Sequence, residues 1–128
     1  MKLLAIAVTS IALLIPFTEV SSAHHLDVGR TPCKEKYTGV KRTKCYIKRA
    51  AAHFGQSTYE ALATAWCESR YNPFADTNPP YVGIYQFDYP TWQGAPYPNK
   101  SRYSARYSAL NAMWYWKQGQ RSRWPVCG

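Results

Sequence analysis

Apolar residues recur every three or four positions in three parts of the chain, as they do on one face of an α-helix. The first part covers residues 47–54 and is followed by Gly55, a typical helix stop signal. The second extends over about residues 58–69, and the third over about residues 104–118. These patterns predict the three main helices of the protein.

The ends of these helices also have recognisable signals. Ser57 and Glu60 have the spacing of a capping box, in which each side chain accepts a hydrogen bond from the other residue's backbone N–H. Asn72 precedes Pro73, and a residue before proline is pushed out of helical geometry. Gly119 follows the third pattern at a C-terminal cap position. These signals mark the start of the second helix and the ends of the second and third.

Six prolines between residues 73 and 98 predict a long structured loop between the second and third helices. Within this loop, residues 82–87 are apolar and aromatic enough for a short strand. Asp88 and Pro90 favour the start of a brief helix that Gly94 ends. The expected fold class is α+β and predominantly helical, with a small β element and a long Pro-rich loop.

Residues 1–23 have the pattern of a secretory signal peptide. Lys2 precedes an apolar stretch, and small residues at positions 20–23 form a cleavage site after Ala23. The apolar run at residues 3–15 is shorter than the roughly 20 residues that a membrane-spanning helix needs. We therefore expect a secreted protein without stable membrane insertion.

The segment 24–44 is polar and basic and lacks a sustained period, so we expect an extended N-terminal segment there, before a domain at 45–128. The chain has a formal net charge of +9, which favours polyanionic partners such as cell-wall polymers, acidic glycans, anionic membranes or nucleic acid. The alternative is that the charge serves solubility alone. Aromatic residues make up 16% of the chain, too many for a small core, so some should form a surface that stacks on sugar rings or bases.

Four cysteines are present, at positions 33, 45, 67 and 127. There is no C-x-x-C pair and there are no histidines at ligand spacing, so no metal site is expected. An even number of cysteines in an exported chain of this size favours disulfides. Cys33, Cys45, Cys67 and Cys127 allow three connectivities, and the spacing alone leaves all three open.

Glu68 is the strongest candidate for chemistry. It lies at the C-terminal end of the second predicted helix, on the same stripe as Ala61 and Ala65. Burial and the negative end of the helix dipole both disfavour an ionised carboxyl, and a carboxyl with a raised pKa can act as a general acid near neutral pH. The alternative is a solvated residue paired with Arg70. The residues around Glu68 leave these two readings evenly balanced.

A wider set of residues resembles a known family. The order and spacing of Glu68-Ser69, Asn72-Pro73, Ala75, the segment 83–87 and Thr91-Trp92 is similar to the lysozyme-like lytic transglycosylase superfamily. Cys67 directly before the glutamate, with Trp124-Pro125-Val126-Cys127 at the end, resembles the catalytic domain of actinobacterial resuscitation-promoting factors. The resemblance covers about residues 47–127.

This resemblance implies a fold, an activity and site residues. It implies a lysozyme-like domain that cleaves the β-1,4 bond between N-acetylmuramic acid and N-acetylglucosamine, as a monomer and without a cofactor. Glu68 would be the sole catalytic acid/base, and Ser69 would support it. A Cys67–Cys127 bridge would tether the C-terminus to the catalytic helix, leaving Cys33 to pair with Cys45. The residues implied to line a glycan-binding groove are Tyr85, Gln86, Thr91 and Trp92.

The acidic residues bear on the mechanism. Ordinary glycosidases use two carboxyls, one on each side of the bond. Among the other acidic residues only Asp76 is well placed to assist Glu68, because Glu60 and Asp88 have capping positions. We therefore expect a lytic transglycosylase that forms a 1,6-anhydro product, with hydrolysis assisted by Asp76 as the alternative. Two further alternatives are a non-catalytic cell-wall-binding or signalling protein of the same fold and, from composition alone, a nucleic-acid binder. We do not expect nucleic acid as the partner.

Overall fold

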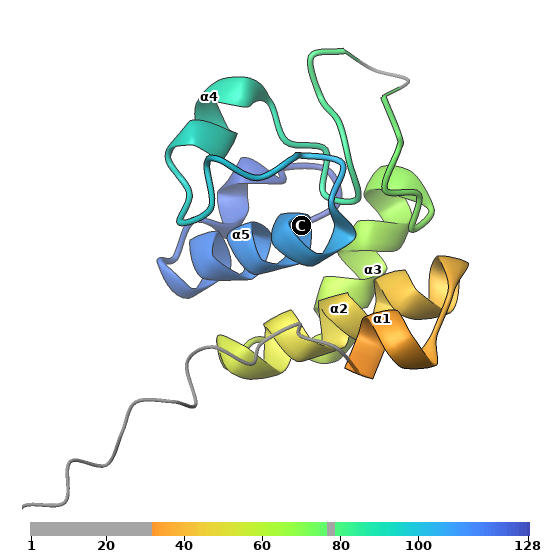
Figure 1. Ribbon diagram of the computed structural model, residues 1–128. Coiled ribbons are helices and arrows are strands. Elements are labelled where there is room, and N and C mark those ends of the chain that lie inside the picture. The colour runs from red at the N-terminus through yellow and green to blue at the C-terminus, as the bar shows by residue number, and fades with distance from the viewer. Residues whose placement is uncertain (1–31, 77–78) are drawn as a thin grey trace, which may run out of the picture.

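The structure is a computed structural model, and it describes residues 32–76 and 79–128 (Figure 1). The predicted signal peptide and its cleavage site lie outside the described residues. The described chain is mostly helical, and no helix in it is long and apolar enough to cross a membrane. Its elements are α1 Pro32–Lys36, α2 Gly39–His53, α3 Thr58–Ser69, α4 Tyr89–Gln93, α5 Ala105–Lys117 and the 3-10 helix η2 Arg121–Arg123.

Three helices begin where the sequence predicts, because their first residues are capped by side chains. Ser57, Asp88 and Ser104 each accept a hydrogen bond from a backbone N–H three residues further on, at α3, α4 and α5 respectively. The reciprocal half of the predicted capping box is not formed. The carboxylate of Glu60 instead binds Nη1 of Arg121 at 2.8 Å, which links α3 to η2.

The expected extended segment at 24–44 is wrong for its described part. Residues 32–36 form α1, and α2 begins at Gly39, well before residue 47. Thr43 is buried one turn before Ile47, so the inner face of α2 continues through the basic stretch while lysines occupy its outer face. The boundary expected between residues 44 and 45 consequently falls inside a helix.

The expected strand at 82–87 is a tight turn closed by a single β-bridge. Val82 and Phe87 pair in antiparallel fashion, and the chain reverses between them. Gly83 and Gln86 both have positive φ, at 83° and 49°, which a continuous strand does not permit. In place of the expected strand, this part of the chain has isolated bridge residues, and Val82 and Phe87 form the bridge that closes the turn.

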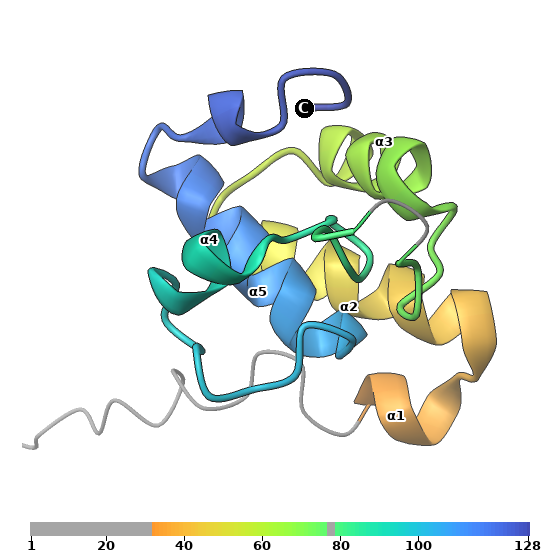
Figure 2. The ribbon, with the colours of Figure 1, turned by 90° about the horizontal axis from the view of Figure 1, so that it is seen from above.

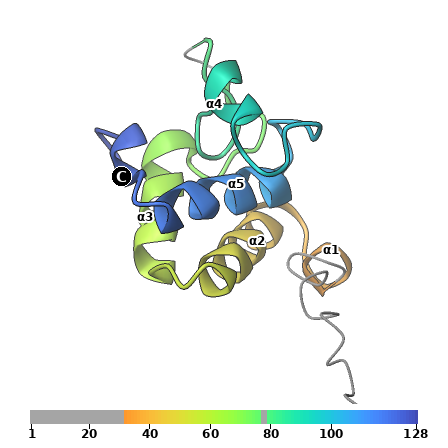
Figure 3. The same ribbon diagram turned by 90° about the vertical axis from the view of Figure 1, so that its left-hand side faces the viewer.

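Helix α5 lies between α2 on one side and α4 with its loop on the other (Figures 1 and 3). Helix α3 packs beside them, and the C-terminal tail lies next to α3 (Figures 2 and 3). The core is made by the facing sides of these elements. Its buried members are Ile47, Ala50, Ala51, Ala61, Ala65, Ile84, Tyr85, Phe87, Trp92, Ala95, Ala109, Leu110, Ala112, Met113, Tyr115, Trp116 and Trp124.

We predict that Gly83→Ala destabilises the protein by about 3 kcal/mol. The residue has positive φ, which costs an L-residue about 1–2 kcal/mol, and an added Cβ would overlap the carbonyl oxygen of Arg102. Gly55→Ala is the matched control, because Gly55 also has positive φ but has open space around it. Urea unfolding of both variants measures the difference. Equal losses of unfolding free energy in the two variants would show that the backbone around Arg102 shifts to make room for the added Cβ at no cost.

Candidate active site

Glu68 occupies the last turn of α3 and is partly buried. Burial raises the pKa of its carboxyl above the usual value, since a desolvated carboxylate is disfavoured. Within the described part of the chain, no hydrogen bond or ion pair engages this carboxyl. The guanidinium of Arg70 lies instead 4.6 Å from the ring centroid of Trp66, so the Glu68–Arg70 pair considered above is not formed.

Two hollows meet at Glu68. One, of about 290 Å³, lies between Glu68 and the C-terminal tail. The other, of about 320 Å³, lies between Glu68 and the loop that follows α3, and includes Asp76. A third hollow of about 240 Å³ continues from the first toward Thr91, and the two share four lining residues. We call these three neighbouring hollows the Glu68 groove. The shared residues are Tyr81, Gln86, Arg123 and Trp124.

The C-terminal tail forms one wall of the groove because it is fastened to α3. Cys67, the residue before Glu68, is bonded to Cys127. The hydroxyl of Thr64 donates to the carbonyl oxygen of Cys127 at 2.9 Å, and Nε1 of Trp124 donates to the carbonyl oxygen of Tyr85 at 2.8 Å. These contacts hold the tail beside the carboxyl of Glu68.

Gln86 lines the groove and has a left-handed backbone conformation, with φ of 49°. Its Nε2 donates to the carbonyl oxygens of Gly83 at 2.9 Å and Ala75 at 3.2 Å. These bonds compensate the strained backbone and fix the side chain beside the path past Glu68. Strained non-glycine residues that are over-determined in this way are typical of functional sites.

Ser69 has a supporting position. Its buried hydroxyl lies 3.0 Å from the carbonyl oxygen of Ala65 in α3 and 3.0 Å from that of Ile84 in the loop. It therefore ties the end of α3 to the turn that carries Gln86. Ser69 also borders the hollow that contains Asp76, but its hydroxyl is engaged by these two carbonyl oxygens.

Two residues expected to line the groove are placed in the core instead. The Tyr85 side chain is fully buried, and its hydroxyl donates to the carbonyl oxygen of Ala61 at 2.7 Å. Trp92 is also buried, and its Nε1 donates to the carbonyl oxygen of Lys100 at 2.9 Å. A large aromatic ring with a satisfied polar atom is a stable core member, so these two residues support the loop. Thr91 does line the far hollow.

Asp76 lines the same hollow as Glu68, and its side chain is exposed. The other described acids are engaged or distant. Glu60 binds Arg121, Asp88 caps α4 by accepting from the N–H of Thr91, and Glu35 belongs to α1. Asp88 also lines the far hollow of the groove, whereas Asp76 shares a hollow with Glu68 itself.

The sequence reasoning missed several groove residues. Tyr81 is 40% exposed and lines two of the hollows, and Arg123 lines the same two from η2. A signal for Arg123 was present, because a bridge from Cys67 to Cys127 must bring the residues just before Cys127 close to Glu68. No local pattern distinguishes Tyr81 from the other tyrosines of the loop.

The described cysteines form two disulfides, Cys33–Cys45 and Cys67–Cys127, in the pairing that the resemblance implies. No cluster of three or more histidine, cysteine, aspartate or glutamate side chains suited to a metal ion occurs in residues 32–76 and 79–128.

The raised pKa of Glu68 predicts a pH-dependent stability difference between the wild type and Glu68→Gln. Burial penalises only the charged carboxyl, so this penalty is absent below the unfolded-state pKa, about 4.3, and develops as the pH rises through the higher folded-state pKa. The variant should match the wild type near pH 3 and gain unfolding free energy relative to it toward pH 7. A difference that is constant with pH would contradict desolvation of Glu68.

No family model, curated protein or solved structure matches the chain.

Proposed function

We propose that this protein is a secreted enzyme with a lysozyme-like domain that cleaves peptidoglycan glycan strands, with Glu68 as its general acid/base. The observation that carries the proposal is the state of the Glu68 carboxyl, which lies where two hollows meet. This carboxyl is partly buried, its pKa is raised, and it has no hydrogen-bond or ion-pair partner in the described chain. A proton donor for a glycosidic oxygen needs these properties. The two disulfides are compatible with export to an oxidising compartment.

The shape of the groove favours a polymer as the substrate. Hollows extend from Glu68 in two directions, so a chain can pass the carboxyl and does not have to end there. An exposed aromatic ring is present on each side: Phe74 in the hollow that contains Asp76, and Tyr81 in the hollow beside the tail. Such rings pack against the apolar faces of sugar rings, while Gln86 and Arg123 offer polar contacts.

The proposed reaction needs one carboxyl. Glu68 donates its proton to the glycosidic oxygen as the bond from that oxygen to the anomeric carbon of N-acetylmuramic acid breaks. The resulting carboxylate then removes the proton of the same sugar's 6-hydroxyl, whose oxygen bonds to the anomeric carbon. This returns the proton to Glu68 and leaves a 1,6-anhydro end, with no water consumed.

The second candidate is hydrolysis, which the shared hollow of Asp76 and Glu68 favours. Asp76 would then activate a water on the opposite face of the sugar, as the second carboxylate of inverting glycosidases does. Under the proposed route, we predict that Asp76→Asn retains wall lysis within about a factor of three, because the exposed carboxyl takes no part in proton transfer. A loss of wall lysis of about a hundredfold or more in Asp76→Asn would show that the reaction is hydrolysis.

Turbidity clearing of purified cell walls tests the proposed activity directly. The enzyme should clear the walls and release soluble fragments. Binding to the walls without clearing would indicate a wall-binding or signalling domain. Affinity for single-stranded nucleic acid without wall binding would instead favour the nucleic-acid binder that the composition allows. The basic surface should add salt-sensitive attraction to anionic wall polymers, because exposed charges are screened over about 8–10 Å at physiological ionic strength.

A further inference from the structure

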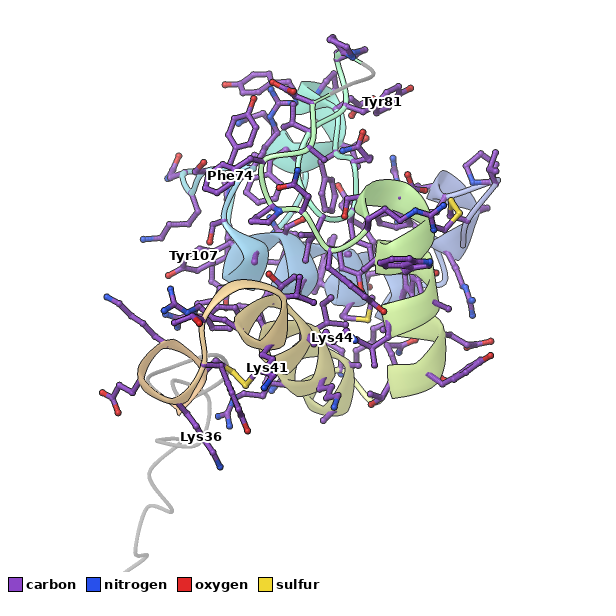
Figure 4. All side chains as sticks on the ribbon, turned by 90° about the vertical axis from the view of Figure 1, so that its right-hand side faces the viewer. Lys36, Lys41, Lys44, Phe74, Tyr81 and Tyr107 are labelled. Atoms are coloured by element: carbon purple, nitrogen blue, oxygen red, sulfur yellow. A yellow bond between two sulfur atoms is a disulfide. The ribbon has the colours of Figure 1, made fainter. Side chains whose placement is uncertain are left out.

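A larger pocket adjoins the Glu68 groove. Its volume is about 630 Å³, and it lies between the first part of α2 and the start of α5. Three of its lining residues, Arg70, Asn72 and Phe74, also line the hollow that contains Glu68 and Asp76. In Figure 4, Phe74 lies on the loop above and the labelled lysines lie on the lower helices α1 and α2. We call this cavity the basic pocket.

The charge of the basic pocket is positive and uncompensated. Its lining includes four cationic side chains, and none of its fifteen lining residues is acidic. A fifth cation, Lys44, has its ammonium 4.9 Å from the ring centroid of Tyr71, which also lines the pocket. A concave surface lined by one sign of charge concentrates ligands of the opposite sign. The lining cations are Lys34, Arg42, Arg70 and Arg106.

Arg106 is one of these lining cations, and its side chain is partly exposed. Its Nε is buried and has no hydrogen-bond partner in the described chain. The guanidinium lies 5.0 Å from the ring centroid of Tyr107. An unsatisfied buried donor is costly in a native structure and requires an explanation. The fork of a guanidinium matches a carboxylate, which can accept two hydrogen bonds from it.

Four of the eleven other lining residues of the pocket are aromatic. Tyr46, Tyr71, Phe74 and Tyr103 all contribute, and the rings of Phe74 and Tyr103 are stacked with centroids 6.3 Å apart. A ligand suited to this lining carries apolar groups as well as negative charge. A short acidic peptide has both, whereas a phosphate-linked polyol offers little apolar surface to bury.

We propose that the basic pocket binds the acidic stem peptide carried by the glycan strand that Glu68 cleaves. This inference rests on the proposed function and adds the substrate class. Because Arg70, Asn72 and Phe74 form a wall shared with the Glu68 hollow, a glycan bound at Glu68 places an attached peptide within reach of the pocket. The enzyme therefore prefers stem-bearing strands to strands stripped of their peptides.

Equilibrium binding to the Glu68→Gln protein tests this inference without turnover. The probes are a stem-bearing glycan oligomer, the same oligomer after removal of its peptides, the free acidic stem peptide, and poly(glycerol phosphate). On this background, Lys34→Gln/Arg106→Gln alters the pocket. Lys48→Gln/Lys117→Gln is the control, because it removes the same charge from exposed positions of α2 and α5 outside the pocket lining.

We expect the stem-bearing oligomer to bind at least about tenfold more tightly than the stripped one, since a single charge-assisted hydrogen bond is enough for a difference of that size. The pocket variant should remove this difference and leave binding of the stripped oligomer unchanged, while the control variant should retain it. If the double variant does not fold, Lys34→Glu, at an exposed position of α1, provides the same comparison.

Several results would overturn the inference. Equal affinity for both oligomers would refute the pocket's role but leave the glycan-cleaving function standing. If the pocket and control variants lose the preference for the stem-bearing oligomer equally, that preference arises from net charge and not from the pocket. Tighter, pocket-dependent binding of poly(glycerol phosphate) would assign the pocket to a phosphate polymer. If neither oligomer binds, the proposed function fails. Binding of the free peptide, compared between the pocket and control variants, then shows whether the pocket takes an acidic peptide.

Discussion

Glu68→Gln should reduce wall lysis by at least about a hundredfold while the protein remains folded. Glutamine has the shape of a protonated glutamate, but it cannot donate a proton to the leaving oxygen or recover one from the 6-hydroxyl. The carboxyl makes no hydrogen bond or ion pair within the described chain, so its replacement removes no structural contact. Lysis rates and thermal unfolding of the two proteins provide the measurement.

Glu60→Gln is the matched control for this experiment. Glu60 belongs to the same helix, but its carboxylate lies outside the groove and binds Arg121 at 2.8 Å between partly exposed side chains. Loss of such a surface pair costs at most about 1 kcal/mol of stability and should leave lysis unchanged. Near-normal lysis by Glu68→Gln, or equal losses in both variants, would remove Glu68 from the chemistry.

Removing the Cys67–Cys127 disulfide should produce the largest loss of stability. Its cysteines are 60 residues apart, and closing a loop of that length contributes roughly 4 kcal/mol by the chain-entropy estimate, a large share of a small domain's stability. The bond also holds the tail that forms a wall of the Glu68 groove. Cys67→Ala/Cys127→Ala should therefore lose lytic activity even at temperatures where it remains folded.

The other disulfide offers a comparison within the same protein. Cys33 and Cys45 are separated by only 12 residues, which corresponds to roughly 3 kcal/mol, and the bond joins α1 to α2, outside the groove lining. Cys33→Ala/Cys45→Ala should lose less stability and keep its lytic rate when folded. Denaturant unfolding and lysis assays on both variants measure these effects. If the short-loop variant loses more activity, the tail does not form a functional wall.

The helices that could be predicted from the sequence are those with local signals. Ser57, Asp88 and Ser104 cap their helices through hydrogen bonds to residues three positions away, so a short window contains the necessary information. The start of α2 was missed because its outer face is basic and only Thr43 and Ile47 mark the inner face before residue 50. Long cationic side chains on an exposed face obscure an amphipathic pattern without breaking the helix.

The candidate site was predictable only in part, for a related reason. Glu68 could be found because its position at a helix end is a local property. Tyr85 was placed in the groove by resemblance, yet its hydroxyl donates to the carbonyl oxygen of Ala61, 24 residues earlier, and its ring is fully buried. Arg123 reaches the groove because the Cys67–Cys127 bond and the hydrogen bonds of Thr64 and Trp124 hold the tail there. Contacts between distant residues decide which aromatic and cationic side chains face a ligand.

Mass spectrometry of digested peptidoglycan tests the central claim most directly. The account predicts fragments that end in 1,6-anhydro-N-acetylmuramic acid, about 18 mass units lighter than hydrolysed ends because no water is added at the anomeric carbon. These fragments should be absent after incubation with Glu68→Gln. Predominantly reducing ends that disappear with Asp76→Asn would contradict the account and make the protein a hydrolytic lysozyme.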